Sequence, residues 1–142
     1  MPFITINDDR TSNQLEQVYR NDDDCIIFYY WNSCGHCHQF KPIFYDVIRD
    51  LMDTRQNFMN KVPIFQIEYD DFDLLPDDYK EVQAFPSVVL YSNGEKKDEF
   101  NQPRTKTNLS NFILSSLGEP SLTYKSPSSS RKRIVKKYPK SI

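Results

Sequence analysis

Residues 25–42 read CIIFYYWNSCGHCHQFKP, and this stretch decides the fold. Its first seven residues form a continuous apolar and aromatic run, which is typical of a central strand covered on both faces. Asn32 and Ser33 are turn residues, and Ser33 is placed to cap a helix that follows. Apolar residues then recur at spacings of three and four over residues 40–51. The stretch therefore predicts a strand, a turn and a helix with one buried stripe, kinked at Pro42.

The rest of the chain continues this alternation of strands and helices. Asp8, Asp9 and Thr11 offer N-cap oxygens for a helix that carries Leu15 and Val18. The pattern predicts further strands at residues 3–6, 62–69, 86–91 and 97–100, and helices within 74–82 and from Thr107 to Leu117. The last two strands are joined by Asn93 and Gly94, a pair that favours a type I′ hairpin turn. The resulting order, β-α-β-α-β-α-β-β-α, predicts an α/β architecture with a mixed sheet flanked by helices.

Composition and charge divide the chain into two parts. It has 142 residues, of which 38% are hydrophobic and 14% aromatic, enough to build a core and to exclude disorder of the whole chain. Residues 119–142 hold seven Lys or Arg and one acidic residue, whereas residues 1–118 hold eleven basic and nineteen acidic ones. Ser and Pro become frequent after Gly118, and the apolar periodicity stops. We therefore predict a domain over 1–118 and a disordered basic tail over 119–142.

The basic tail suggests an anionic partner. Residues 125–140 contain the sequence SSSRKRIVKK, a pattern that can bind nucleic acid or another anionic surface, or act as a nuclear signal. A tail that serves only solubility is the alternative.

The compartment expected from the sequence is intracellular. The N-terminus, MPFITINDDR, has no basic region followed by an apolar core, and the chain ends in PKSI, which is no retention signal of the endoplasmic reticulum. Three cysteines are too few for a secreted disulfide framework, and no apolar run is long enough to span a membrane. The frequent use of Asn, Ile, Lys, Tyr and Phe fits an AT-rich genome, so a cytoplasmic protein of a large DNA virus, packaged in the virion, is a further hypothesis.

The chemistry is expected at Cys34-Gly35-His36-Cys37, where the predicted strand passes into the predicted helix. Cys34 lies at the unpaired N–H groups of the helix start, which favour its thiolate, so it is the candidate attacking thiol. Cys37 lies one turn further along and is the candidate resolving thiol. His36 adds a cation or a hydrogen-bond donor beside them. This spacing predicts a redox-active disulfide that needs no other cofactor.

These residues have two other possible uses, a zinc site and a haem attachment site. A zinc site needs four ligands, and the chain offers only Cys25, His36 and His38 besides the pair. Cys25 begins a predicted central strand, where a small buried side chain is expected. Residues 34–38 also fit the C-x-x-C-H signature of c-type haem attachment. The redox-active pair is the favoured interpretation, with no metal.

Four separated motifs resemble the thioredoxin superfamily. The segment FYYWNSCGHCHQFKP resembles its active-site region, the CGHC matches the protein disulfide isomerase type, and Pro42 matches the family's helix-kinking proline. The segment VQAFPSVVLYSNGE resembles the family's cis-proline strand and hairpin. This implies a cis Pro86 facing the cysteines, with Phe85 helping to bind substrate backbone. The segment FNQPRTKTNLSNFI is similar to a loop whose arginine moves toward the second cysteine, which makes Arg104 a candidate catalytic residue. The resemblance covers about residues 1–118 and implies a thioredoxin fold.

The resemblance implies a thiol–disulfide oxidoreductase, of the isomerase or oxidase kind, that acts on protein thiols and disulfides and exchanges electrons with a redox partner. Two positions depart from the family. Phe28 stands where the family usually has a buried acid, and Ser33 precedes Cys34 where a tryptophan is frequent, with Trp31 two residues earlier as a structural aromatic. Without the acid, steps that deprotonate Cys37 should suffer more than substrate oxidation, and Arg104 would compensate in part. The alternative is a thioredoxin-like binding module, tethered by the basic tail and turning over slowly.

Overall fold

A five-stranded sheet forms the centre of the first of two units in this computed structural model, which describes residues 3–116. The first unit extends to Asn101 and the second begins at Gln102. The expected boundary at Gly118 and the basic tail lie outside the described residues. The elements of the first unit are β1 (Phe3–Thr5), α1 (Asp9–Arg20), β2 (Asp24–Tyr30), α2 (Gly35–Thr54), α3 (Gln56–Lys61), β3 (Ile64–Glu68), the short 3₁₀ helices η1 (Tyr69–Leu74) and η2 (Asp77–Tyr79), β4 (Ser87–Ser92) and β5 (Glu95–Glu99).

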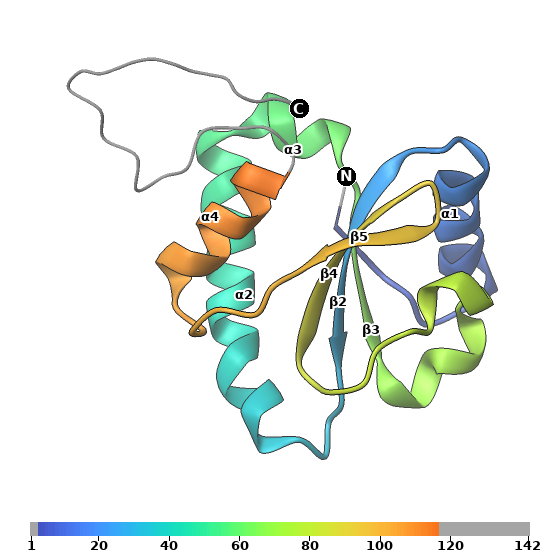
Figure 1. Ribbon diagram of the computed structural model, residues 1–142, viewed down its shortest axis with the longest axis horizontal. Helices are drawn as coiled ribbons and strands as arrows, with labels where there is room; N and C mark the ends of the chain where they lie inside the picture. The colour runs from blue at the N-terminus through green and yellow to red at the C-terminus, as the bar shows by residue number, and fades with distance from the viewer. Residues whose placement is uncertain (1–2, 117–142) are drawn as a thin grey trace. The chain divides into compact units, whose positions relative to one another are not determined.

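The sheet is mixed, and its strands lie in the order β1-β3-β2-β4-β5. β1 and β2 both run parallel to β3, whereas β4 runs antiparallel to β2 and β5 antiparallel to β4. Helix α1 lies on one side of the sheet and helices α2 and α3 lie on the other (Figure 1). The α/β architecture with a mixed sheet flanked by helices is confirmed.

Strand β2 is the middle of the sheet and is buried on both faces. Its residues from Cys25 to Tyr30 are all buried, as the continuous apolar run predicts. Residues 25, 27 and 29 belong to one core cluster together with Leu15 and Val18 of α1. Phe28 points to the other face and packs against α2, with its ring centroid 5.6 Å from that of Phe40 and 4.4 Å from that of Phe44. Two layers of helix therefore hold the strand that leads into the CGHC segment.

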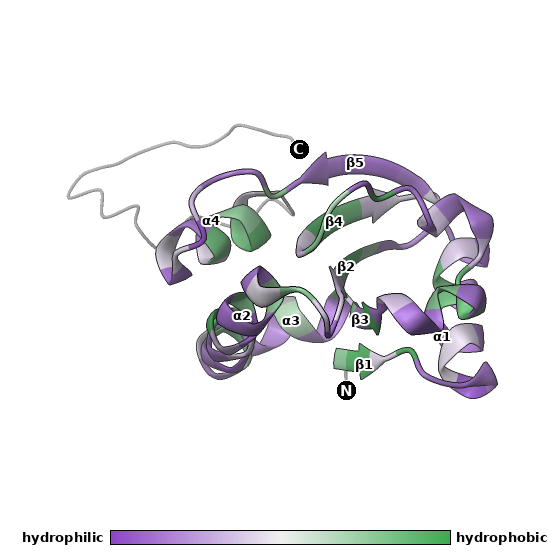
Figure 2. Cartoon of the chain, turned by 90° about the horizontal axis from the view of Figure 1, so that it is seen from below, coloured by the Kyte–Doolittle hydropathy of each residue, from purple (hydrophilic) through white to green (hydrophobic). Residues whose placement is uncertain are grey.

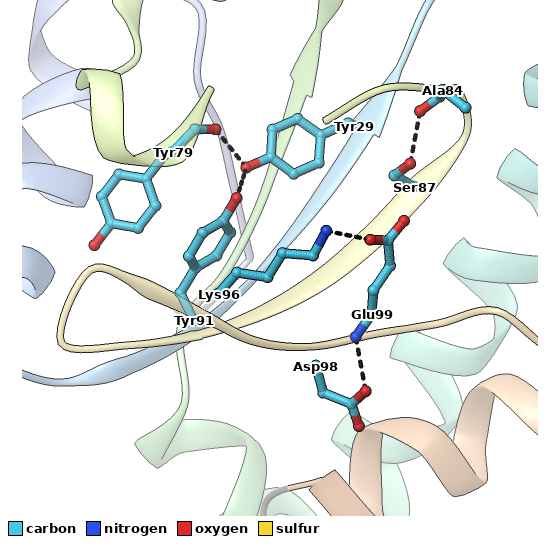
Figure 3. A network of polar contacts seen from close by, with 8 residues as sticks. All are labelled: Tyr29, Tyr79, Ala84, Ser87, Tyr91, Lys96, Asp98 and Glu99. Carbon is cyan, nitrogen blue, oxygen red and sulfur yellow. Dashed lines mark hydrogen bonds and ion pairs between the residues drawn. The ribbon is translucent and has the colours of Figure 1, made fainter. Parts of the chain in front are cut away.

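The core on the α1 side contains a buried tyrosine network (Figure 3). The Tyr29 hydroxyl donates to the carbonyl of Tyr79 at 2.6 Å and lies 2.7 Å from the hydroxyl of Tyr91. Burial raises the pKa of Tyr29, and it raises the pKa of Tyr91 to about 12, so both hydroxyls stay protonated. The network ties β2 and β4 to η2.

The hairpin between β4 and β5 has the predicted turn. Asn93 and Gly94 both adopt positive φ, 56° and 77°, as a type I′ turn requires. The strand after it, β5, consists of charged residues and is the hydrophilic edge beside hydrophobic β4 (Figure 2). Charged side chains on an edge strand discourage pairing with another chain.

Several expected details are corrected by the structure. Ser33 does not cap α2, because Cys34 is the N-cap residue and no side chain caps that helix. The short helix expected within 74–82 is the three-residue 3₁₀ helix η2, whereas the sequence pattern does not predict η1 or α3. Helix α1 has the expected cap, since Asp8 and Thr11 form a capping box.

The second unit contains α4 (Lys106–Ser116) among its described residues. Thr105, and not Thr107, caps this helix: its hydroxyl oxygen accepts the backbone N–H of Asn108 at 3.1 Å. In the described part of the chain, 3–116, no helix has both the length and the apolar character to cross a membrane.

Candidate active site

Cys34 lies where the chain leaves β2 and enters α2. Its backbone N–H donates to the carbonyl of Trp31 at 2.9 Å, which closes the turn, and its own conformation is extended. As the N-cap residue it stands beside the N–H groups of the first helical turn, which have no partner within the helix. Gly35 and His36 form that first turn and are exposed. A Cβ at Gly35 would meet no atom within 4 Å apart from its chain neighbours, so the first turn of α2 is unobstructed at this position.

The start of β4 brings a second segment to the cysteine. The Cys34 thiol donates a hydrogen bond to the carbonyl of Phe85, with sulfur and oxygen 3.6 Å apart. The peptide bond between Phe85 and Pro86 is cis. The half-buried Cys34 therefore faces the segment that the sequence suggested for substrate backbone, 51 residues away along the chain.

Cys37 lies one turn into α2 and is buried, and both thiols are reduced. Burial raises the pKa of Cys37 to about 11, and a hydrogen bond with Cys34 adds to the rise. Two contacts oppose it: the backbone N–H of Trp31 donates to the Cys37 sulfur at 3.5 Å, and the charge of Lys41 favours the thiolate. The pair is thus asymmetric, with an accessible thiol and a buried one that deprotonates with difficulty.

No proton acceptor stands at position 28 beneath the pair. Phe28 is fully buried and is enclosed by the rings of Phe40, Phe44 and Tyr30. A benzene ring can neither take nor give a proton, so any group that assists Cys37 has to lie elsewhere.

Asn32 is held by three side chains, a feature that the sequence did not suggest. Its backbone N–H donates to Oε2 of Glu68 at 2.9 Å, and its carbonyl accepts the Nε2–H of His38 at 2.7 Å. Its side-chain oxygen accepts a hydrogen bond from Nζ of Lys41 at 3.3 Å. The turn between Trp31 and Cys34 is therefore fixed from β3 and from α2.

Four aromatic rings gather next to the cysteine. The ring of Trp31 lies 5.6 Å from that of Tyr69 and 6.4 Å from that of Phe85, and Phe72 contacts both Tyr69 and Phe85. Trp31 is 37% exposed and Tyr69 47%, so this aromatic cluster faces solvent. Such a surface suits an apolar peptide.

Residues 4–115 match the thioredoxin family. The chain belongs to that family. It is similar to a protein disulfide-isomerase of Arthroderma benhamiae, with 32% identity over 100 residues, which cover 69% of this chain and 18% of that enzyme. It is also similar to a thioredoxin of Rickettsia prowazekii, with 24% identity over 112 residues, 79% of this chain and 99% of the relative.

Solved structures show the same fold. The J-Trx1 fragment of ERdj5 superposes with a TM-score of 0.62 at 18% identity, covering 82% of this chain and 52% of that one. The zinc-bound form of human ERp44 gives the same TM-score and identity, over 83% of this chain and 33% of that one. The predicted thioredoxin fold is confirmed.

The remaining predicted site residues of this thioredoxin domain are distributed as follows. Pro42 lies inside α2, with an exposed side chain. Arg104 is exposed and precedes α4 in the second unit, and its catalytic role stays a prediction.

Cys25 lies far from the pair. It belongs to the core cluster on the α1 side, at the other end of β2. Five strand residues lie between it and Trp31, so the two positions are about 20 Å apart. Among residues 3–116 no three His, Cys, Asp or Glu side chains are grouped as metal ligands would be.

Proposed function

We propose that this thioredoxin-family domain is a protein thiol–disulfide oxidoreductase of the isomerase or oxidase kind. The observation that carries the proposal is the asymmetry of the cysteine pair. Half-buried Cys34 donates a hydrogen bond to the carbonyl of Phe85, which precedes cis Pro86, whereas Cys37 is buried one turn further along α2. The similarity to a fungal protein disulfide-isomerase and to a bacterial thioredoxin supports the same chemistry.

The reaction proceeds in two exchanges of sulfur bonds. In the reducing direction the Cys34 thiolate attacks one sulfur of a substrate disulfide, a mixed disulfide forms, and the other substrate sulfur leaves as a thiolate. Cys37 then loses its proton and attacks the Cys34 sulfur, which closes the Cys34–Cys37 disulfide and releases the second substrate thiolate. Two electrons pass from the protein to the substrate. In the oxidising direction the same steps run in reverse, and a separate oxidant restores the disulfide.

The substrate surface is proposed around the cis-proline segment. The Phe85 carbonyl and the following strand end can pair with extended substrate backbone beside Cys34. The exposed aromatic cluster, with Trp31 and Tyr69 at its outer side, would bind apolar side chains next to the substrate cysteine. Unfolded proteins, which expose such side chains, are therefore the expected substrates.

Incubation with a reduced, unfolded protein substrate under an oxidising glutathione buffer tests this function. We expect the wild-type chain to speed disulfide formation and Cys34→Ser to abolish the effect. Cys25→Ala is the matched control, because that cysteine is buried away from the site, and it should keep the wild-type rate. Wild-type activity in Cys34→Ser would contradict the proposal.

The reduction potential decides the direction of net electron flow. Thioredoxin lies near −270 mV and protein disulfide isomerase near −180 mV. His36 between the cysteines favours the reduced form and so a more oxidising pair, and we expect a value near the second figure. A value near −270 mV would instead make the domain a reductant.

A second candidate is a binding module with slow turnover, which Phe28 favours because it offers no proton acceptor beneath the pair. Trapping with Cys37→Ala separates the two functions. An enzyme accumulates mixed disulfides with several proteins through Cys34. A module retains one noncovalent partner even when Cys34 is also replaced.

A further inference from the structure

We propose that Glu68, His38 and Lys41 form a clamp on Asn32 that keeps the backbone N–H of Trp31 on the sulfur of Cys37, and that they are thereby positioning residues for the resolving step. This rests on the proposed thiol–disulfide exchange. It adds the means by which a buried thiol without an acid beneath it becomes able to attack.

The clamp holds Asn32 at three chemically distinct points. Glu68 holds the backbone N–H, His38 the carbonyl and Lys41 the side-chain oxygen, at 2.9, 2.7 and 3.3 Å. The neighbouring N–H, that of Trp31, is the one that reaches the Cys37 sulfur at 3.5 Å. The Trp31 N–H belongs to the peptide unit just before the one that carries the Asn32 N–H, and the two planar units meet at the Trp31 Cα, so a displacement of Asn32 would shift this N–H away from the sulfur.

Glu68 anchors the clamp from the sheet. It ends β3, is buried, and pairs in register with Tyr30 at the end of β2. One of its oxygens accepts from Asn32 and the other from the backbone N–H of Asp70, at 2.6 Å. The two N–H groups satisfy a buried carboxylate, which would otherwise be costly to desolvate, and hold it in place.

Lys41 anchors the clamp from the helix and also carries charge. Its ammonium group lies 4.0 Å from the ring centroid of Tyr30, a cation–π contact that limits its freedom, while it donates to Asn32. From there its charge lowers the pKa of Cys37, as the Trp31 N–H does. Lys41 thus favours the thiolate directly through its charge, and indirectly by holding Asn32, the residue next to Trp31.

The two half-reactions can be timed separately with dithiodipyridine, a neutral disulfide that the Lys41 charge does not attract. The Cys34 thiolate attacks it, a mixed disulfide forms, and one thiopyridone is released. The Cys37 thiolate then attacks the Cys34 sulfur, the Cys34–Cys37 disulfide forms, and the second thiopyridone leaves. Each protein thiol gives up one proton, each departing thiolate takes one up to become thiopyridone, and the probe takes two electrons. Both releases are followed by absorbance in the reduced full chain.

Two variants each remove one partner of the hydrogen bond between Lys41 and Asn32. Lys41→Met and Asn32→Ala should each slow the second release about three- to tenfold, with less than a twofold change in the first. The double variant should be no slower than the slower single one, because both changes break the same contact. Lys41→Arg, which keeps the charge, should retain most of the wild-type rate of the second release. Lys97→Met removes an exposed lysine of β5 and should change the rate of neither release.

Glu68→Gln keeps an acceptor oxygen but loses the charge, and it should slow the second release by a smaller factor. The clamp is overturned if Asn32→Ala leaves the second release unchanged, since Lys41 would then act by charge alone, or if both releases slow equally. A wild-type chain that gives no first release would instead refute the proposed exchange itself. Circular dichroism of each variant verifies that the fold is intact.

Discussion

At the scale of single residues, Cys37 sets the pH dependence of the reaction. Burial raises its pKa to about 11, so only a small fraction is thiolate at neutral pH. Because the thiolate is the attacking species, the resolving step should accelerate about tenfold for each pH unit between about pH 6 and 9. Stopped-flow measurement of the second thiopyridone release tests this. A plateau below pH 9 would mean that the thiol in the mixed disulfide deprotonates far more easily than in the reduced form.

The burial of Cys25 predicts that its thiol does not react with alkylating reagents in the folded chain. It is fully buried, and desolvation together with the charge of Asp24 raises its pKa to about 12. We expect iodoacetamide at pH 8 to modify Cys34 in the folded chain and to leave Cys25 unmodified, which peptide mass spectrometry will show. Unfolding in guanidinium should make all three cysteines react. Rapid labelling of Cys25 in the native chain would contradict its place in the core.

At the scale of elements, the packing of β2 on α2 depends on Phe28. Its ring contacts Phe40 and Phe44, and Phe28→Ala should lower the free energy of unfolding by about 3–5 kcal/mol through lost burial and a cavity. Phe28→Leu, which keeps most of the volume, should cost less. Urea unfolding followed by tyrosine fluorescence measures both losses. Equal stability of the Ala variant would mean that α2 closes over the gap.

The β4–β5 turn tests whether position 94 requires glycine. Gly94 has a φ of 77°, and a Cβ there would collide with the ring of Tyr19, which is held by a hydrogen bond to Asp78. Gly94→Ala should therefore cost at least about 1–2 kcal/mol in the free energy of unfolding. Gly35→Ala is the matched control, because a Cβ there meets nothing within 4 Å, and it should be neutral or slightly stabilising. Similar losses in both variants would contradict the collision.

Local signals explain which elements could be predicted. Three signals each depend on only a few neighbouring residues: the apolar run of β2, the apolar stripe of α2 and the Asn93–Gly94 pair. The strand, the helix and the turn that they predict are all present. α3 is six residues long and carries no stripe of its own, so its helical turn depends on tertiary context. The segment after β3 forms two 3₁₀ turns because Pro76 interrupts it.

The candidate site could likewise be predicted only where its residues are close together in the sequence. The CGHC motif and the Phe85–Pro86 segment could be named from sequence, since each is a contiguous pattern. The clamp could not, because Glu68 meets Asn32 across 36 residues and uses a backbone N–H that any residue at 32 would offer. In the sequence, His38 is distinguished only as a candidate metal or haem ligand, and Lys41 belongs to no motif. Contacts to main-chain atoms leave no residue-type signal in a single sequence.

At the scale of the whole molecule, the two parts of the chain carry opposite charge. Seven Lys and Arg residues follow Gly118, whereas acidic residues outnumber basic ones in residues 1–118. If the tail binds a polyanion, counterion release makes the affinity fall steeply with salt, with a log–log slope of up to about −5 for single-stranded nucleic acid when all seven cations engage. The acidic domain alone should be repelled.

Fluorescence anisotropy of a labelled single-stranded oligonucleotide at about 50 and 200 mM salt tests this with two variants. A chain ending at Gly118 should lose binding, and so should a full-length chain in which the seven basic residues of 119–142 are replaced by Gln, which preserves the length of the tail. The second variant separates charge from mere length. Binding that survives in it, or that does not weaken with salt, would assign the tail a role other than electrostatic contact, and disulfide exchange by the domain should be the same in all three chains.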